Sequence, residues 1–281
     1  KFLFTFLFCS LIYSNPEPPI DNSVNYDYIR ERGDSFFKQG SASFKGDFVQ
    51  TKSGKVLTQR KNGVLLWEDI PFALPPVGEL RWKAPRSFIQ NDLNILPKSN
   101  NFCHQEIGGE IQEIYEKGSE DCLYLDIRAP HGEREKMPVM FWIHGGGNTS
   151  GHKDFYDFSE LVKKKGVIVV STNYRLGPLG FFTHPAIQDL NTGLDKTSNF
   201  GILDIILALK WVNENISSFG GDPENITIFG ESAGGHNVLS LLVAPQAKGL
   251  FNKAISQSGG TTVTSTNDAE KINRNAPDYI S

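Results

Sequence analysis

A serine inside a Gly-x-Ser-x-Gly pentapeptide is the group in this chain whose surroundings most clearly suggest chemistry. Ser232 lies between Gly230 and Gly234; residues 226–229 before it are mostly β-branched, and residues 238–242 after it are largely apolar. A strand that turns sharply at a serine and continues as a helix exposes the hydroxyl, and the glycines leave room for that strained bend. A hydroxyl held in this way can attack an acyl carbon, so the pattern predicts acyl transfer by a serine nucleophile.

A second glycine-rich segment offers groups that such a serine requires. Acyl transfer through a serine needs a base, a group that orients the base, and donors for the oxyanion. The backbone amide of Ala233 is one donor, because it follows the nucleophile on the turn. Residues 144–147, His-Gly-Gly-Gly, follow a short apolar run, and glycine amides can approach a substrate oxygen without a Cβ in the way. Taken alone the run also fits a tight turn, and its pairing with the serine motif favours an oxyanion-binding loop.

The base is the part that the sequence does not supply. His236 is the only histidine after Ser232, and the later acids lie in the polar segment 268–278, which has no strand pattern. A spacing of four residues puts Ser232 and His236 on one helical face, but the serine faces the cleft from the turn while the histidine lies one turn down the helix. We therefore expect His236 to be structural and His144 to brace the glycine loop.

Strands alternating with helices surround these motifs. This alternation predicts an α/β fold, with a mostly parallel central sheet and helices on both faces. A hairpin is expected across residues 43–57, around Ser53-Gly54, and residues 70–86 are too rich in proline for regular structure, so they should wrap the surface. Strands are expected at 64–67, 122–127, 139–143, 167–170, 226–229 and 253–257, and helices at 155–165, at 201–219 and after Ser232.

The overall composition is that of an ordinary globular protein with one sizeable core. The chain has 281 residues, of which 39% are apolar and 21% charged, and its formal net charge is −4. A mildly negative chain gives no electrostatic reason to expect a nucleic-acid partner. The other histidines show no metal-ligand spacing, so we expect neither a metal nor a cofactor.

The first residues have the order of an export signal. Lys1 precedes a short apolar stretch, and residues 1–14 are typical of a secretory signal peptide that is too short to be a stable membrane anchor. A buried N-terminal helix or strand is the alternative. Residues 15–40 are polar, contain prolines and show no apolar period, so we expect a loose leader. The protein is therefore expected to be secreted or periplasmic.

Two cysteines remain once the expected signal peptide is removed. In an exported protein such a pair, here Cys103 and Cys122, is typical of a disulfide. A bridge would close a loop of about twenty residues and stabilise the fold by roughly 3 kcal/mol. Two reduced cysteines in the core are the alternative.

Long stretches of the chain, in order, resemble the type-B carboxylesterases, the cholinesterase-like branch of the α/β-hydrolases. The resemblance covers residues 43–260 and implies an α/β-hydrolase fold that hydrolyses esters of small molecules. The matching stretches are LPPVGELRWKAP (74–85), SEDCLYLDI (119–127), FWIHGGG (141–147), STNYRLGPLGFF (171–182), the serine motif (219–235) and KAISQSG (253–259).

The resemblance also implies roles for residues around the serine. Ser232 matches the nucleophile, and the amides of Gly146, Gly147 and Ala233 match the oxyanion donors of the family. Glu231 matches the glutamate beside the nucleophile, which shapes the local field and is not the acid of the triad.

Further matches and departures lie in the disulfide region and the glycine loop. Cys103 and Cys122 resemble the first disulfide of the family, and Arg81 and Glu120 resemble its structural ion pair beside that loop. The loop between the cysteines contains no tryptophan, on which the cholinesterases rest the choline cation, so choline esters are not expected as substrates. Asn148 stands where an aromatic residue often follows the glycines, which leaves the acyl pocket wall undefined.

The triad expected from the resemblance is incomplete. In this fold the nucleophile is followed along the chain by an acid and then by a histidine on later strands. We therefore expect residues 41–281 to be the N-terminal part of one α/β-hydrolase domain, incomplete at its C-terminus, and the fragment to be inactive without the remainder. The alternatives are a non-catalytic adhesion or binding module on the same fold, and a complete, truncated pseudo-enzyme.

Overall fold

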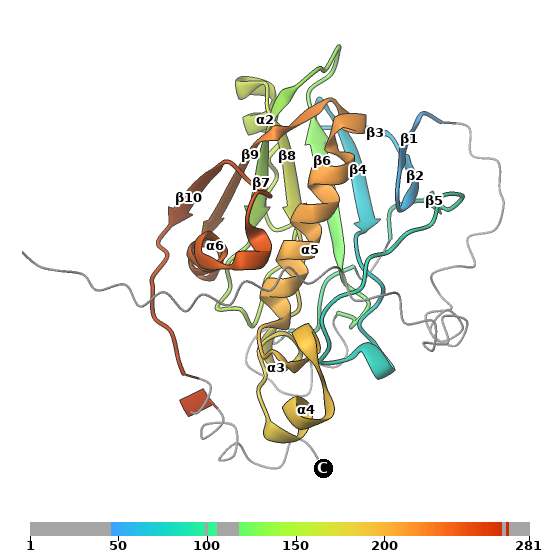
Figure 1. The fold of residues 1–281 in the computed structure, drawn as a ribbon. Helices are drawn as coiled ribbons and strands as arrows, with labels where there is room; N and C mark the ends of the chain where they lie inside the picture. Colours follow the sequence, from blue (N-terminus) through green and yellow to red (C-terminus); the bar gives the residue numbers. More distant parts are fainter. Residues whose placement is uncertain (1–45, 99–100, 106–117, 266–267, 270–281) are drawn as a thin grey trace, which may run out of the picture. The chain divides into compact units, whose positions relative to one another are not determined.

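The computed structural model describes residues 46–98, 101–105, 118–265 and 268–269 (Figure 1). The contacts of the chain divide it into two units, residues 1–40 and 41–281, and the described residues lie in the second. The expected signal peptide (1–14) and leader (15–40) lie outside the described residues. The acids of the segment 268–278 lie there too, with the exception of Asp268.

A seven-stranded mixed sheet forms the centre of the described unit, in the order β10-β9-β7-β8-β6-β4-β3. The pairs from β10 to β8 are parallel, and the pairs from β8 to β3 are antiparallel. The strands are β3 (Gln59–Lys61), β4 (Val64–Pro71), β6 (Tyr124–Ala129), β7 (Met137–Ile143), β8 (Ile168–Thr172), β9 (Gly221–Glu231) and β10 (Lys253–Gln257). The carboxyl ends of β7 and β9 therefore lie side by side, because these two strands are parallel neighbours.

Helices cover both faces of this sheet, with α5 crossing it in Figure 1 and α6 beside β9 and β10. The α-helices are α2 (Ser159–Lys165), α3 (Gly177–Gly180), α4 (Pro185–Leu190), α5 (Phe200–Asn215) and α6 (Ala233–Val243). Short 3₁₀ turns are η1 (Gly78–Leu80), η3 (Gly193–Lys196), η4 (Ile216–Phe219) and η5 (Pro245–Ala247).

Two hydrophobic clusters, one on each face of the sheet, explain why helices cover both faces. Phe141 and Ile143 of β7 pack in the larger cluster together with side chains of α5 and α6. Trp142, which points to the opposite face, packs in the smaller cluster with Val162 of α2 and Phe229 of β9. Side chains alternate along a strand, so a strand that is apolar throughout, such as β7, must be buried on both faces.

A three-stranded sheet lies outside the central one. The hairpin predicted around Ser53-Gly54 is confirmed: β1 (Phe48–Thr51) and β2 (Gly54–Leu57) are antiparallel, and Thr51 pairs with Gly54. The two-residue strand β5 (Asn94–Ile95) adds to β2.

Several predicted boundaries differ from the observed ones. The segment 70–86 was expected to wrap the surface, but β4 continues to Pro71, and apolar side chains between the prolines, such as Phe72 and Leu80, are buried in the core. The helix expected from residue 155 begins only at Ser159, where the carboxylate of Asp157 accepts hydrogen bonds from the Ser159 amide and hydroxyl. The bond to the Ser159 amide satisfies one of the first amides of the helix, which have no partner within the helix itself.

A buried ion pair joins the segment after β8 to α5. The carboxylate of Asp204, which is completely buried, accepts hydrogen bonds from Nε (2.8 Å) and Nη2 (2.7 Å) of Arg175. It also accepts one from the Arg175 backbone amide at 3.0 Å. Side chain and backbone of Arg175 are therefore both held by one helix residue.

We expect the substitution Asp204→Asn to lower the free energy of unfolding by about 3 kcal/mol, because it leaves a buried guanidinium without its counter-charge. Urea unfolding followed by circular dichroism measures this. Glu214→Gln is the matched control, since the Lys52–Glu214 pair has side chains about half exposed and should change stability by less than about 1 kcal/mol. Equal losses in the two variants would contradict the importance of the buried pair.

Candidate active site

Ser232 occupies a strained turn between β9 and α6. Its φ and ψ are 56° and −120°, a combination that non-glycine residues rarely adopt. The Ser232 amide donates to the carbonyl of Gln257 in β10 (2.9 Å), and the Ser232 carbonyl accepts from the His236 amide (3.0 Å). Strain of this kind persists only where the surrounding structure holds it, which here is the neighbouring strand and the first turn of α6.

The strained turn exists because glycines around it allow backbones to touch. A Cβ on Gly234 would collide with the carbonyl oxygen of Ile143, the last residue of β7. A Cβ on Gly230 would lie 2.8 Å from the same oxygen. The turn therefore packs directly against the end of β7, from which the glycine loop (144–147) departs.

The structure brings the glycine loop and the serine together. A Cβ on Gly145 would lie 3.3 Å from Cβ of Ser232 and 2.7 Å from the carbonyl oxygen of Glu231. The loop then bends away through Gly146 and Gly147, whose φ angles are 105° and 64°. These positive values are accessible to glycine at little cost, which explains the residue type.

Three backbone amides at this junction have no acceptor in the part of the chain that the structure describes. The amides of Gly146, Gly147 and Ala233 donate no hydrogen bond to any other residue that the structure describes. For Ala233 this follows from its place in the first turn of α6, where helix amides lack an intrahelical partner and carry a partial positive charge. The hydroxyl of Ser232 also has no hydrogen-bond partner within the described ranges. The junction therefore combines a free hydroxyl with donors suited to an anion.

The two histidines nearest the serine have structural contacts. Nδ1 of His236 lies 2.9 Å from the carbonyl oxygen of Ser232, so its ring bonds to the backbone and not to the hydroxyl. His144 is buried, stacks on Tyr174 with ring centroids 4.4 Å apart, and has Nδ1 2.8 Å from the carbonyl oxygen of Gly145. Its Nε2 has no partner among the described residues, and burial lowers the pKa of His144 to about 4. A neutral imidazole thus braces the start of the loop.

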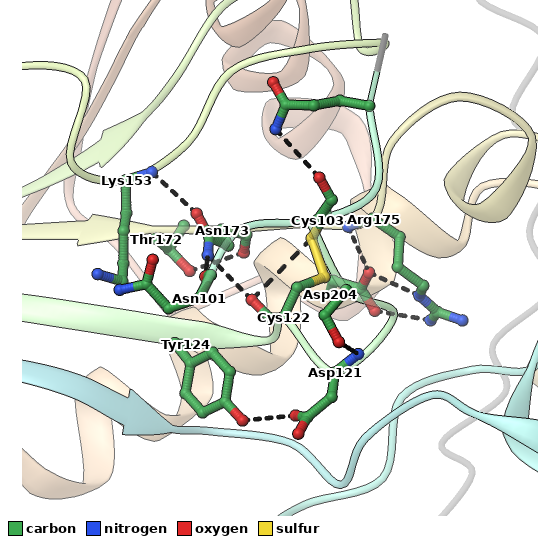
Figure 2. Close-up of a disulfide and its surroundings, with 12 residues drawn as sticks. Asn101, Cys103, Asp121, Cys122, Tyr124, Lys153, Thr172, Asn173, Arg175 and Asp204 are labelled. Atoms are coloured by element: carbon green, nitrogen blue, oxygen red, sulfur yellow. Dashed lines mark hydrogen bonds and ion pairs between the residues drawn. A yellow bond between two sulfur atoms is a disulfide. The ribbon is translucent and has the colours of Figure 1, made fainter. Parts of the chain in front are cut away.

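The structure contains both the expected disulfide and the expected ion pair. Cys103 and Cys122 are joined by a disulfide, and Figure 2 shows Asn173 hydrogen-bonded beside it to the Cys122 carbonyl. Arg81 and Glu120 form a two-bond ion pair, with both N–O distances 2.6 Å.

Gln105, two residues beyond the disulfide, was not predicted as a functional residue. Its Oε1 accepts from the Gly151 amide at 2.8 Å, and its Nε2 donates to the Gly151 carbonyl at 3.0 Å. A Cβ on Gly151 would lie 2.6 Å from the Gly145 carbonyl oxygen. The buried glutamine therefore connects the disulfide region to the glycine loop.

Lys153 is a second residue that sequence reasoning missed. Only 1% of its surface is exposed, and its ammonium lies within 2.9 Å of carboxylates from Asp69, Asp126 and Asp154. Its amide donates to Oδ1 of Asn173 at 2.8 Å. Burial alone would lower the pKa of Lys153, but the three carboxylates raise it above its ordinary value. The charged side chain therefore fixes the chain a few residues after the glycine loop.

A serine on a strained strand-to-helix turn, at the carboxyl end of a parallel strand, defines an α/β-hydrolase. The chain belongs to the carboxylesterase family, whose model matches residues 45–277. Membership in this family confirms the predicted fold class, which the comparison with solved structures supports independently.

Individual relatives are similar over most of this chain. Para-nitrobenzyl esterase of Bacillus subtilis (strain 168) is 44% identical over 219 residues, covering 76% of this chain and 44% of the relative. Carboxylesterase 1E of Rattus norvegicus is 41% identical over 235 residues, covering 75% and 40%. A solved structure named PNB esterase superposes with a TM-score of 0.68 at 42% identity, covering 78% of this chain and 45% of that one. The chain thus spans about two fifths of the length of the curated relatives it matches.

The described residues contain neither a metal-binding cluster nor a membrane-spanning helix. No three of their His, Cys, Asp and Glu side chains gather in a way that could hold a metal ion. None of their helices combines the length and the apolar character needed to cross a membrane.

We expect Gly234→Ala to lower the free energy of unfolding by roughly 2 kcal/mol. Alanine normally stabilises a helix by up to about 1 kcal/mol over glycine, so a net loss must come from the collision with the Ile143 carbonyl. Thermal unfolding measures the change, with the exposed Ser240→Ala in the same helix as the control. A Gly234→Ala variant as stable as the wild type would contradict the tight packing at this turn.

Stability should depend on pH through His144. Its folded-state pKa of about 4 lies below the ordinary histidine pKa of 6.5, so the unfolded chain takes up the proton first and stability falls as the pH drops through this window. Between pH 7.5 and 5 we expect this histidine to account for a loss of about 2 kcal/mol. The loss should be absent in His144→Gln and retained in the exposed control His131→Gln, as measured by urea unfolding at both pH values. An unchanged pH profile in His144→Gln would contradict the assignment.

Proposed function

We propose that this protein hydrolyses carboxylic esters of small molecules through Ser232 and an acyl-enzyme intermediate. The observation that carries the proposal is a hydroxyl on a strained turn beside three backbone amides, all four groups having no hydrogen-bond partner among the described residues. The family to which the chain belongs supports it. Because the chain spans about two fifths of its curated relatives, the activity is proposed for the full-length protein.

Each group at the junction has a step in this reaction. Oγ of Ser232 attacks the ester carbonyl, and the carbonyl oxygen gains negative charge as the tetrahedral intermediate forms. The amides of Gly146, Gly147 and Ala233 donate hydrogen bonds to that oxygen. Donors that are already oriented and lack other partners need little reorganisation, which is why such sites lower the barrier. Collapse of the intermediate releases the alcohol, and water later hydrolyses the acyl-enzyme. Glu231, beside the nucleophile, contributes to the field and not to proton transfer.

The proton of Ser232 requires a base that we assign to residues outside the described ranges. His236 is unsuited, because its ring contacts the carbonyl oxygen of Ser232. We therefore propose that residues 41–281 are the N-terminal part of one hydrolase domain and that the triad acid and histidine lie further along a longer chain. Residues 1–281 alone are then nearly inactive, since a serine without a base is a poor nucleophile at neutral pH.

We also propose that the protein is exported, with a signal peptide over residues 1–14 and a leader over residues 15–40. The charged start and apolar stretch support export, and so does the disulfide, which persists in oxidising compartments. The net charge of −4 gives no electrostatic reason to propose a nucleic-acid partner. The sequence contains no apolar run long enough to propose a stable membrane anchor.

The substrate class follows from the family and from one missing side chain. Two relatives are named para-nitrobenzyl esterase and carboxylesterase 1E, which supports esters of carboxylic acids as the substrate class. The loop between Cys103 and Cys122 contains no tryptophan that could bind a choline cation. A non-catalytic adhesion module on the same fold is the alternative function, and the intact serine and glycines argue against it.

Labelling of the full-length protein by a fluorophosphonate, together with hydrolysis of a p-nitrophenyl ester, tests the proposal. We expect Ser232→Ala to abolish labelling and to lower the hydrolysis rate at least about a thousandfold, because the acyl acceptor is lost. Ser240→Ala, an exposed serine two turns along the same helix, should behave as the wild type. Equal labelling of wild type and Ser232→Ala would refute the esterase function.

A further inference from the structure

The residue after the glycines is held from several sides. Asn148 has a φ of 58°, in the left-handed region that a non-glycine residue enters at a cost. Its backbone carbonyl accepts a hydrogen bond from the Gly177 amide at 2.7 Å, at the start of α3. Its side chain is half-buried and turned toward polar groups of two other elements. An unfavourable conformation held by this many contacts indicates a position that the fold specifies closely.

The side-chain amide of Asn148 is paired with that of Asn237. Nδ2 of Asn237 donates to Oδ1 of Asn148 at 2.9 Å, while the reverse bond, from Nδ2 of Asn148 to Oδ1 of Asn237, is long at 3.5 Å. Asn237 is 2% exposed and lies on α6, five residues after Ser232. One side of this pair therefore belongs to the glycine loop and the other to the helix that carries the nucleophile.

Tyr174 completes the arrangement from the end of β8. Its completely buried hydroxyl lies 3.1 Å from Oδ1 of Asn148 and 2.8 Å from the carbonyl oxygen of His144. Burial raises the pKa of Tyr174, so the hydroxyl keeps its proton and acts as a donor. The single hydroxyl hydrogen of Tyr174 can be donated to the His144 carbonyl or to Oδ1 of Asn148. These two residues lie directly before and directly after the three glycines.

We propose that Asn148, Asn237 and Tyr174, here named the amide latch, are positioning residues that set the distance between the amides of Gly146 and Gly147 and the amide of Ala233. The inference rests on the proposed esterase function. The two glycine amides and the Ala233 amide come from different elements, the loop after β7 and the start of α6. The Asn148–Asn237 pair is the direct side-chain connection between those same two elements. The Asn148 side chain is therefore directed toward α6, and we do not assign it to the wall of the acyl pocket.

The expected catalytic consequence is a fall in kcat with little change in KM. Oxyanion donors act on charge that develops in the transition state, so their misplacement lowers kcat and kcat/KM together. The informative variants are Asn148→Gly, which removes the amide while tolerating the positive φ, and Asn237→Ala. Each should lower kcat, per active site titrated with a fluorophosphonate, about tenfold. The double variant should be no slower than the slower single one, whereas independent effects would multiply to about a hundredfold.

The matched control is Asn215→Ala. Asn215 is also a buried helical asparagine whose amide makes two hydrogen bonds, to the Lys52 amide (2.9 Å) and the Trp211 carbonyl (2.8 Å). It lies at the end of α5, outside the junction. We expect this variant to lose stability and to keep the wild-type kcat per titrated site, so a loss of kcat through general destabilisation would be visible.

Hydrogen exchange separates this inference from the proposed function. In the full-length protein, the hydrogen-bonded amides of Thr149, Ser150 and Gly151 should exchange at least about ten times faster in Asn237→Ala than in the wild type and in Asn215→Ala. Unchanged exchange would overturn the latch whatever the activity. Faster exchange with an unchanged kcat per site would overturn the positioning role alone. Wild-type protein without Ser232-dependent ester hydrolysis would refute the proposed function, and the positioning role that rests on it, even if exchange is faster.

Discussion

The candidate site depends on close backbone contact where side chains are absent. The strained Ser232 turn packs on the carbonyl of Ile143 because Gly230 and Gly234 have no Cβ, and Gly145 lies against the serine for the same reason. A backbone that approaches this closely cannot adjust gradually, since any added atom forces two elements apart. The parallel pairing of β7 and β9 supplies the geometry, as it brings the two carboxyl ends to one edge. The serine turn and the glycine loop are therefore brought together by a single packing contact.

Contact at one point does not orient a loop, and the chain after the glycines is attached again at Asn148, Gly151 and Lys153. The Asn148 amide pairs with α6, the Gly151 backbone pairs with the amide of Gln105, and the ammonium of Lys153 is surrounded by three carboxylates. These attachments lead to different parts of the fold: the nucleophile helix, the disulfide region and the sheet. Glycines contribute conformational freedom, which would blur the position of their amides, and the polar contacts remove that freedom after the loop has turned.

Patterns local to the sequence predicted the parts of the site that are themselves local. The β-branched run before Ser232 and the apolar run before His144 indicated strands, and the glycines indicated sharp turns. The attachments were not predictable, because they join residues far apart in the chain whose types are common at surfaces. Lys153 stands in a polar stretch and is nevertheless buried, since its partners Asp69 and Asp126 come from β4 and β6. Asn148 was considered only as a possible pocket wall, and periodicity contains no information about its partner Asn237.

There is a physical reason why the proposed oxyanion donors and the proposed base come from different parts of the protein. Donors for an oxyanion are most effective when folding has already oriented them, and here the first turn of α6 and the glycine loop are oriented by contacts within the described ranges. The proton transfer, in contrast, needs a group within hydrogen-bond reach of the serine hydroxyl, and the two histidines near the serine, His144 and His236, both contact backbone carbonyls instead. A histidine held by the carbonyl of its own nucleophile cannot also reach the hydroxyl. Within the described residues, neither histidine near Ser232 bonds to its hydroxyl, which is the reason for proposing a base from another part of the protein.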